Sequence, residues 1–450
     1  LEKIVYNGKI HSVSVTIGGR LMKAFTKMNK DELLTLKKSL EQRYQEFKAL
    51  DLKLDMSRGK PCGEQLDLSM SILDMKECTI DNIECRNYGG LEGLPSIRRL
   101  FAQLLEVDEN NVIIGGTSSL TLMYDYIAQA MLFGICGNKP WSKLEKVKFL
   151  CPVPGYDRHF AFCEHFGIEM INVPMTDNGP NIKVINELIK DDSVKGMFCV
   201  PKYSNPQGIT YSDETVKALA ALNPAAKDFR IIYDNAYCVH DLDKQGDKLL
   251  NIFDELPKNN NEDLVIMVAS TSKITFAGSG VSCIIASGNN LDDIKKRLKI
   301  QSISQDKMNQ LRHFKFFENV ENIKAHMQKQ AVILKPKFDC VINYLNNELA
   351  NKEIASWYVP HGGYFISLDI MPGCAKRVGQ LCEEAGVVLT TIGATFPYGK
   401  DPQDSNIRIA PSYPPIDELS KAANLLCICV QIAAIEKLLN LKDNHPIVFC

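Results

Sequence analysis

The sequence lacks several patterns that would assign a chain quickly to a class. Its 450 residues include 15 cysteines, but no C-x-x-C pair and no Cys/His cluster with zinc spacing. The eight histidines form no H-E-x-x-H motif, so we predict no metal site. The longest apolar run, Leu425–Ile435, contains Gln431 and is too short to cross a bilayer. We therefore expect no membrane segment, and reduced cysteines in the cytoplasm.

An excess of charge of one sign is also missing. The 52 Lys and Arg residues against 54 Asp and Glu give a net charge of −2, which does not favour a nucleic-acid or membrane partner. The hydrophobic share of 45% and charged share of 24% are typical of a globular protein and exclude a disordered chain. The length predicts two domains, or one large domain with an added lobe.

Residues 1–27 differ from the rest of the chain. They carry five basic residues against one acid, together with several Ser and Thr. A targeting leader, a mobile arm and a segment added in cloning all fit this composition, whereas the apolar content is too low for a secretory signal. We leave this segment out of the fold prediction.

From Asn29 onward, short apolar segments alternate with helical patterns. Helices are expected over 31–47, 95–105, 118–133, 156–166, 181–190 and 212–222. Strands are expected at Val112–Ile114, Val147–Leu150, Glu169–Val173, Met197–Val200, Arg230–Tyr233, Val265–Ala269 and Val281–Ala286. This alternation predicts an α/β fold with a mostly parallel sheet flanked by helices.

Beyond about residue 291 the pattern changes to that of a smaller α+β domain. Long helical patterns cover 305–349, and further helices are expected over 375–385 and 416–438, with short strands near 354–359, 364–369, 387–391 and 407–410. We divide the chain into 28–75 (N-terminal part of the small domain and linker), 76–310 (large domain) and 311–450 (C-terminal small domain).

Polar residues follow four of the predicted strands, at the edge where an open α/β sheet binds ligands. The first group is Gly115-Gly116-Thr117-Ser118-Ser119. Its glycines allow a tight turn, and its hydroxyls and free amides at a helix start can bind an anion. Such caps are also common in helices that bind nothing.

The other three groups have equally plain alternatives when each is taken alone. Asn205 lies in an Asn-Pro turn, and Asp234 ends an apolar strand, where a carboxylate is costly unless it is paired or caps a helix. Lys273, in Ser270-Thr271-Ser272-Lys273, is either solvated or a partly desolvated amine suited to forming a Schiff base. In this order, however, the four groups predict a pyridoxal phosphate site, because that cofactor needs a lysine, a carboxylate, hydrogen-bond donors and an anion cradle.

The chain resembles a fold-type I, pyridoxal-phosphate-dependent class I aminotransferase, and within that class the bacterial aspartate aminotransferase subgroup related to MocR-type enzymes. The similar stretches are Leu54-Asp55-Met56-Ser57-Arg58-Gly59-Lys60-Pro61, Arg86-Asn87-Tyr88-Gly89-Gly90-Leu91-Glu92-Gly93, Val153-Pro154-Gly155-Tyr156-Asp157-Arg158-His159, Ser272-Lys273-Ile274-Thr275-Phe276-Ala277-Gly278 and Ile407-Arg408-Ile409-Ala410-Pro411-Ser412-Tyr413-Pro414. They extend over roughly residues 30–438.

The resemblance implies a role for each matching residue. Lys273 would form the Schiff base and move the proton, and Asp234 would pair with the ring nitrogen. The remaining implied contacts are Asn205 and Tyr237 to the phenolate oxygen, Tyr156 on the ring, Thr117, Ser118, Ser119, Ser270 and Ser272 around the phosphate, and Tyr88 from the neighbouring subunit of a homodimer. Arg408 would bind the substrate α-carboxylate; without the resemblance, it also fits a structural ion pair.

One departure from the family concerns the phosphate. Many relatives carry a phosphate-binding arginine in a pattern like Ala-Gly-x-Arg, but this sequence reads Ala277-Gly278-Ser279-Gly280. The phosphate would then depend on hydroxyls, backbone amides and the helix start.

The resemblance implies transfer of an amino group between an acidic amino acid, such as aspartate, and a 2-oxo acid such as 2-oxoglutarate. A side-chain carboxylate needs a second cation, for which we favour Arg58 and Lys307, although surface ion pairs explain both equally. A lyase or decarboxylase on the same scaffold is the alternative. A MocR-like non-catalytic sensor is a further one, which the near-neutral charge disfavours.

Overall fold

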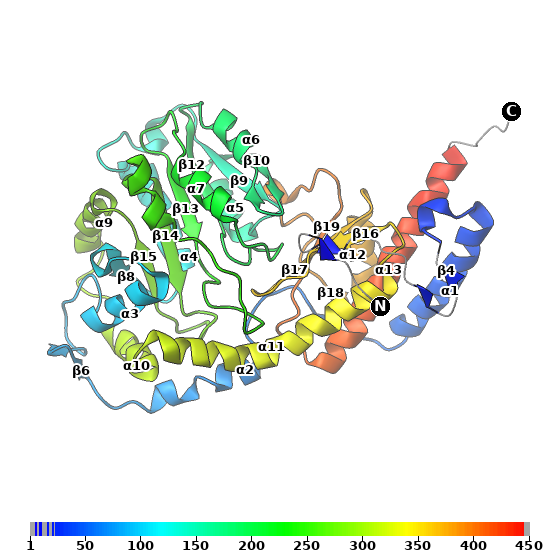
Figure 1. Cartoon of the computed structure of the whole chain (residues 1–450), viewed down its shortest axis with the longest axis horizontal. Helices are drawn as coiled ribbons and strands as arrows, with labels where there is room; N and C mark the ends of the chain where they lie inside the picture. Colours follow the sequence, from blue (N-terminus) through cyan, green and yellow to red (C-terminus); the bar gives the residue numbers. More distant parts are fainter. Residues whose placement is uncertain (1–4, 7–8, 11–15, 18–19, 22, 445–450) are drawn as a thin grey trace.

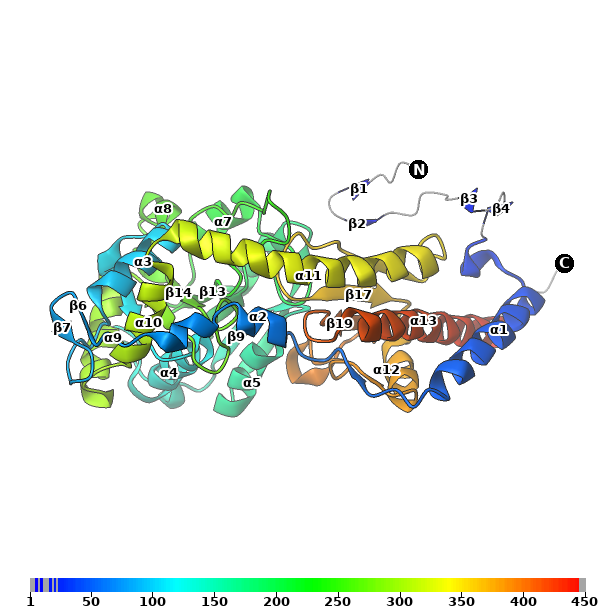
Figure 2. The same ribbon diagram turned by 90° about the horizontal axis from the view of Figure 1, so that it is seen from below.

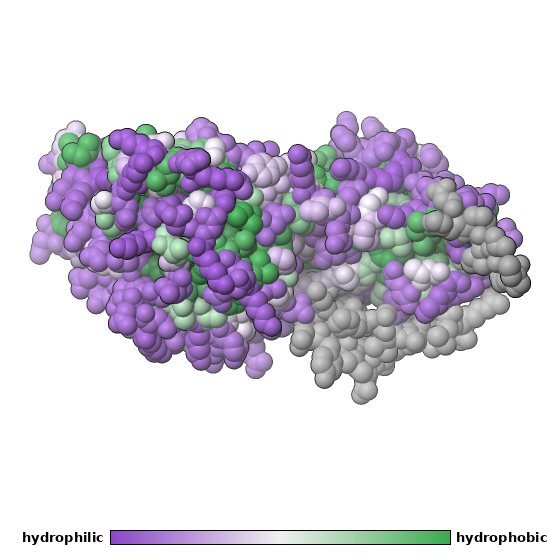
Figure 3. Space-filling view, turned by 90° about the horizontal axis from the view of Figure 1, so that it is seen from above, coloured by the Kyte–Doolittle hydropathy of each residue, from purple (hydrophilic) through white to green (hydrophobic). Residues whose placement is uncertain are grey.

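The computed structural model describes residues 5–6, 9–10, 16–17, 20–21 and 23–444. They form a larger and a smaller lobe, seen as separate masses in Figures 1 to 3. Most of the predicted leader or arm, residues 1–27, lies outside the described residues. Its end does not, because Phe25 in the 3-10 helix η1 (Phe25–Lys27) is 1% exposed and belongs to the core of the smaller lobe.

The larger lobe is built on an eight-stranded sheet. Its strands, in spatial order, are β11 (Gly179–Pro180), β10 (Glu169–Thr176), β9 (Lys148–Val153), β12 (Val194–Cys199), β13 (Arg230–Asp234), β14 (Val265–Ser270), β15 (Ser282–Ile285) and β8 (Val112–Ile114). The neighbours from β10 to β14 are parallel, whereas β15 runs antiparallel to both β14 and β8. The predicted α/β fold is confirmed, with a mixed sheet.

Helices cover both faces of this sheet. They are α3 (Pro95–Leu105), α4 (Ser119–Phe133), α5 (Asp157–Phe166), α6 (Ile182–Leu188), α7 (Asp213–Ala220), α8 (Ile252–Glu255), α9 (Gly288–Gln301) and α10 (Lys307–Phe317). Along β13, Ile231 and Tyr233 enter the core on one face and Ile232 enters the core on the other, as the period of two requires. Helix α9 lies in a stretch for which the sequence analysis predicted no helix.

The smaller lobe has a three-stranded antiparallel sheet, β16 (Ala355–Trp357), β17 (Ile366–Ile370) and β19 (Asn406–Ile409). Helices α1 (Lys30–Lys48), α12 (Ala375–Glu384) and α13 (Ile416–Asn444) surround it. Strand β5 (Leu54–Asp55) pairs with β18 (Val387–Val388). By length and composition α13 could cross a membrane, but 83% of its most apolar stretch is buried in the core.

Helix α11 (Val320–Glu348) runs along both lobes, as Figures 1 and 2 show, and packs on α3 in one and α13 in the other. Between β5 of the smaller lobe and α3 of the larger lobe, the chain forms four short elements. They are α2 (Gly63–Asp67), the 3-10 helix η2 (Met70–Asp74), β6 (Thr79–Ile80) and β7 (Ile83–Glu84). The domain boundary expected at 310/311 falls inside α10, which packs on α3. The domain limits 28–75, 76–310 and 311–450 stay predictions.

Candidate active site

The carboxyl ends of β8 and β14 bring a set of hydroxyls together. Ser118 caps α4, its Oγ accepting the Leu120 N–H at 3.2 Å. Ser270 ends β14 and donates to the Ser272 hydroxyl at 3.1 Å, and Ser272 donates to the Thr117 carbonyl at 3.1 Å. Four of the predicted phosphate residues line one cavity: Ser118, Ser119, Ser270 and Ser272. Hydroxyls beside a helix N-terminus suit a phosphate group.

Gly280 lies against the same turn. A Cβ at this position would stand 2.9 Å from the Thr117 carbonyl oxygen and 3.0 Å from the Ser272 nitrogen. Both neighbours are backbone atoms, which cannot rotate away. The glycine that replaces the expected arginine is therefore required by the close approach of the two strand ends.

Asp234 has one oxygen engaged and one free. It is 3% exposed, and His159 from the first turn of α5 lies 3.2 Å from its Oδ2. The imidazole stacks on Phe198, with ring centroids 4.5 Å apart, which fixes its orientation. Asp234 Oδ1 is buried without a hydrogen-bond partner in the described part of the chain, although Asp234 lines the cavity. A buried acceptor of this kind needs a donor.

Lys273 lines the same cavity, with its Nζ 5.0 Å from the centroid of the Tyr237 ring. Burial lowers the pKa of the lysine amine, and the charge of Asp234 opposes that shift. Burial raises the pKa of Tyr237, so its hydroxyl stays protonated and can donate. Burial, together with the charge of Lys273, lowers the pKa of nearby His240 to about 3, so this imidazole is neutral.

Asn205 and Arg408 meet where the two lobes touch. Arg408 in β19 is 7% exposed, and its Nη1 donates to Asn205 Oδ1 at 3.3 Å and to Asp157 Oδ1 at 2.7 Å. Because arginine only donates, the Asn205 oxygen faces Arg408, and the Asn205 amide nitrogen is left to donate elsewhere. Tyr156, which lines the cavity, precedes Asp157, and burial raises its pKa to about 12.

Three predicted residues lie away from this cavity. Lys307 is 2% exposed, and its Nζ donates to the carbonyls of Asn87 and Gly89, each at 2.6 Å. The ammonium group is thus bound by the carbonyls on either side of Tyr88, which is itself 78% exposed. Arg58 is exposed and makes no ion pair with the described residues. The residue before it, Ser57, accepts a hydrogen bond at its carbonyl from the Thr390 hydroxyl. Arg408 Nε contacts the same hydroxyl at 3.3 Å.

His159, Asp157 and Thr390 are contact residues that the sequence analysis did not select. His159 and Asp157 lie in one of the stretches that resemble the family, but only Tyr156 was given a role there. Both residues could have been selected from their position in the first turn of α5, because a helix that follows a strand begins at the edge of the sheet where ligands bind. Thr390 follows a two-residue strand and carried no comparable signal.

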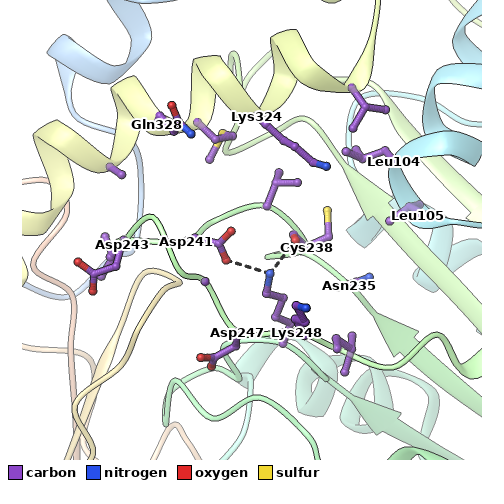
Figure 4. Close-up of a pocket in the computed structure, with 18 of the residues that line it drawn as sticks. Leu104, Leu105, Asn235, Cys238, Asp241, Asp243, Asp247, Lys248, Lys324 and Gln328 are labelled. Carbon is purple, nitrogen blue, oxygen red and sulfur yellow. Dashed lines mark hydrogen bonds and ion pairs between the residues drawn. The ribbon is translucent and has the colours of Figure 1, made fainter. Parts of the chain in front are cut away.

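A larger cavity, of about 1090 Å³, lies under α11 on the face of the sheet to which Tyr233 points. Figure 4 shows Lys324 and Gln328 of α11 across it from Asp241 and Asp243. Its acids have partners: Asp241 pairs with Lys202 at 2.9 Å, Asp243 pairs with Lys335 at 3.6 Å, and Asp247 contacts the His361 imidazole at 2.9 Å. Lys273 does not line it, so we place the active site at the smaller cavity.

The residues at the smaller cavity fit pyridoxal phosphate. The orphaned Asp234 oxygen matches the protonated ring nitrogen of this cofactor, and the hydroxyls at the start of α4, which line the same cavity, match its phosphate. On a mixed α/β sheet with a second lobe, this arrangement defines the fold-type I class of pyridoxal-phosphate enzymes.

Comparison with known proteins places the chain within that class. A sequence model of the family described as aspartate amino-transferase matches residues 28–442, and the chain belongs to this family. Aspartate aminotransferase of Corynebacterium glutamicum is 43% identical over 408 residues, which cover 89% of this chain and 94% of that one. The chain is therefore an aminotransferase that uses pyridoxal phosphate.

Solved structures agree with this fold. The crystal structure of an aspartate transaminase from Corynebacterium glutamicum has a TM-score of 0.90 and 41% identity, covering 92% of this chain and 99% of that one. An α-aminoadipate aminotransferase from Thermus thermophilus, complexed with N-(5'-phosphopyridoxyl)-L-leucine, has a TM-score of 0.68 at 19% identity, covering 86% and 93%. The second likeness extends to the fold alone.

Proposed function

We propose that this aminotransferase moves the amino group of an acidic amino acid, aspartate above all, to a 2-oxo acid such as 2-oxoglutarate. The observation that carries the proposal is the arrangement of Lys273, Asp234 and Asn205 around one cavity, with Arg408 of the smaller lobe donating to Asn205. The names of the similar proteins support aspartate as the substrate.

Each residue then has a task that its surroundings suit. Pyridoxal phosphate supplies an aldehyde for the amine and a ring that withdraws electrons. Lys273 would hold the aldehyde until the amine of the substrate displaces it, and the freed lysine amine, whose pKa burial lowers, would then take the proton from the substrate α-carbon. The free oxygen of Asp234 would accept from the ring nitrogen. Asn205 and Tyr237 would donate to the ring oxygen, Tyr156 would pack against the ring, and Arg408 would bind the α-carboxylate.

For the side-chain carboxylate, we favour Arg58. Its side chain is exposed, and the carbonyl of its neighbour Ser57 accepts from the Thr390 hydroxyl, which Arg408 Nε also contacts; this chain of contacts supports the choice of Arg58. Lys307, in contrast, already donates to two carbonyls, and a buried ammonium that gave them up would leave both unsatisfied.

We also propose a homodimer. Tyr88 is exposed and does not line the cavity of its own subunit. To contact the phosphate, it would have to reach the cavity of a second copy of the chain. Large apolar side chains are exposed on the segments that pack on α10 or lead into it: Met70 at 50%, Leu73 at 53%, Ile300 at 89% and Ile303 at 66%. Single exposed apolar residues are ordinary, but several around one helix indicate an interface. The free state of the described cysteines supports a cytoplasmic location.

The test is to add amino acids one at a time to the purified enzyme and follow the visible absorption of its bound cofactor. We expect aspartate and glutamate to change it, and Lys273→Ala to abolish the change. Acidic amino acids without effect would contradict the substrate proposal. Release of pyruvate from cysteine-type amino acids, without amino transfer, would favour the lyase alternative.

A further inference from the structure

Arg408 is already bound to a carboxylate of the protein itself. Asp157 is the first residue of α5 in the larger lobe, and Arg408 belongs to β19 in the smaller one, so their 2.7 Å ion pair joins the two lobes. Asp157 keeps 32% of its side-chain surface exposed, whereas the Arg408 side chain keeps 7%. The aspartate is therefore the partner that can move toward solvent.

The hydrogen bonds of Arg408 leave little room for a second carboxylate. Nη1 donates to Asp157 and Asn205, and Nε contacts the Thr390 hydroxyl at 3.3 Å. Nη2 makes no hydrogen bond within residues 23–444. The guanidinium also lies over the Phe365 ring, 4.9 Å from its centroid, which limits its rotation. A carboxylate binds arginine best through two parallel N–H groups, and with Asp157 in place only one nitrogen is free.

We propose that Asp157 is an internal competitor for Arg408: it holds the guanidinium before substrate binds and must leave Nη1 before a substrate carboxylate can bind through two hydrogen bonds. This inference rests on the proposed role of Arg408. It makes the interlobe ion pair and substrate binding mutually exclusive. Asp157 also repels an incoming carboxylate, so it weakens the binding of every ligand that uses Arg408.

The test compares Asp157→Asn with the wild-type enzyme, both loaded with cofactor. Succinate is the probe, since it is a dicarboxylate without an amino group and cannot react. We expect the dissociation constant for succinate, measured by calorimetry, to fall about fivefold in Asp157→Asn, which corresponds to roughly 1 kcal/mol of lost competition. The KM values for the amino acid and the oxo acid should fall with it, without a matching rise in kcat.

Glu164→Gln is the matched control, because it removes one negative charge from an exposed position on the same helix. Equal or weaker succinate binding in Asp157→Asn, or an equal gain in Glu164→Gln, would overturn the proposal. Arg408→Gln separates this failure from that of the proposed function. If it leaves succinate binding intact, the role of Arg408 itself is wrong; if it abolishes binding while Asp157→Asn changes nothing, only the competition is wrong.

Discussion

His159 and Asp234 form a buried pair in which the imidazole engages one carboxylate oxygen at 3.2 Å and leaves the other free on the cavity side. Stacking on the Phe198 ring fixes the orientation of the His159 imidazole. The carboxylate is thereby oriented before any ligand arrives, which is the arrangement that electrostatic catalysis requires.

Replacing His159 by phenylalanine should keep the stack and remove the hydrogen bond. Because Asp234 would lose its orientation, we expect kcat to fall about tenfold, equivalent to one hydrogen bond of about 1.4 kcal/mol. The loss should be smaller than that of Asp234→Ala, for which we expect about a hundredfold or more. Single-turnover rates with aspartate measure both. Equal losses in the two variants would contradict a positioning role.

Gly280→Arg tests the close approach of the phosphate turn. Although it restores the residue that relatives carry, its Cβ would meet backbone atoms of Thr117 and Ser272. We expect overpacking to cost about 1 to 3 kcal/mol of stability and to weaken cofactor retention during dialysis. Gly280→Ala serves as the milder control. Tighter retention in Gly280→Arg would show that the turn can open.

Burial of Lys273 should affect the stability of the cofactor-free enzyme. Its pKa is lowered in the folded protein, so the unfolded chain binds the proton more strongly, and folding becomes more favourable as pH rises toward the ordinary lysine value of about 10.4. Lys273→Met removes the buried amine and should raise the melting temperature by about 1 to 3 °C at pH 7. The difference between the two proteins should shrink at higher pH. A difference independent of pH would exclude the amine as its cause.

Lys307→Gln separates the two roles considered for that residue. Since its ammonium binds the carbonyls of Asn87 and Gly89, we expect a loss of about 1 to 3 kcal/mol in stability and weaker cofactor binding through Tyr88. The ratio of kcat/KM for aspartate to that for alanine should stay unchanged. Arg58→Gln should lower this ratio. A drop in the Lys307 variant alone would instead favour Lys307 as the second cation.

The sequence predicted the framework better than the contacts. The strands of the large sheet contain apolar runs that end in marked polar residues, so Asp234, Asn205 and Lys273 could be placed at one edge by the rule for parallel strands. The ion pair of Asp157 with Arg408 could not be predicted, because it depends on how two lobes approach. Lys307 was favoured as a second cation because of the family resemblance, which says nothing about the carbonyls that surround it.

The packing of α1 against α13 bears on how the protein is made. The first long helix leaves the ribosome early, yet its apolar side chains, Leu33 and Leu40 among them, find their partners only after residues 416–444 have been synthesised. The sheet of the larger lobe can assemble in the meantime. In the smaller lobe, α1 is therefore synthesised before α13 but completes its packing only once α13 has been made.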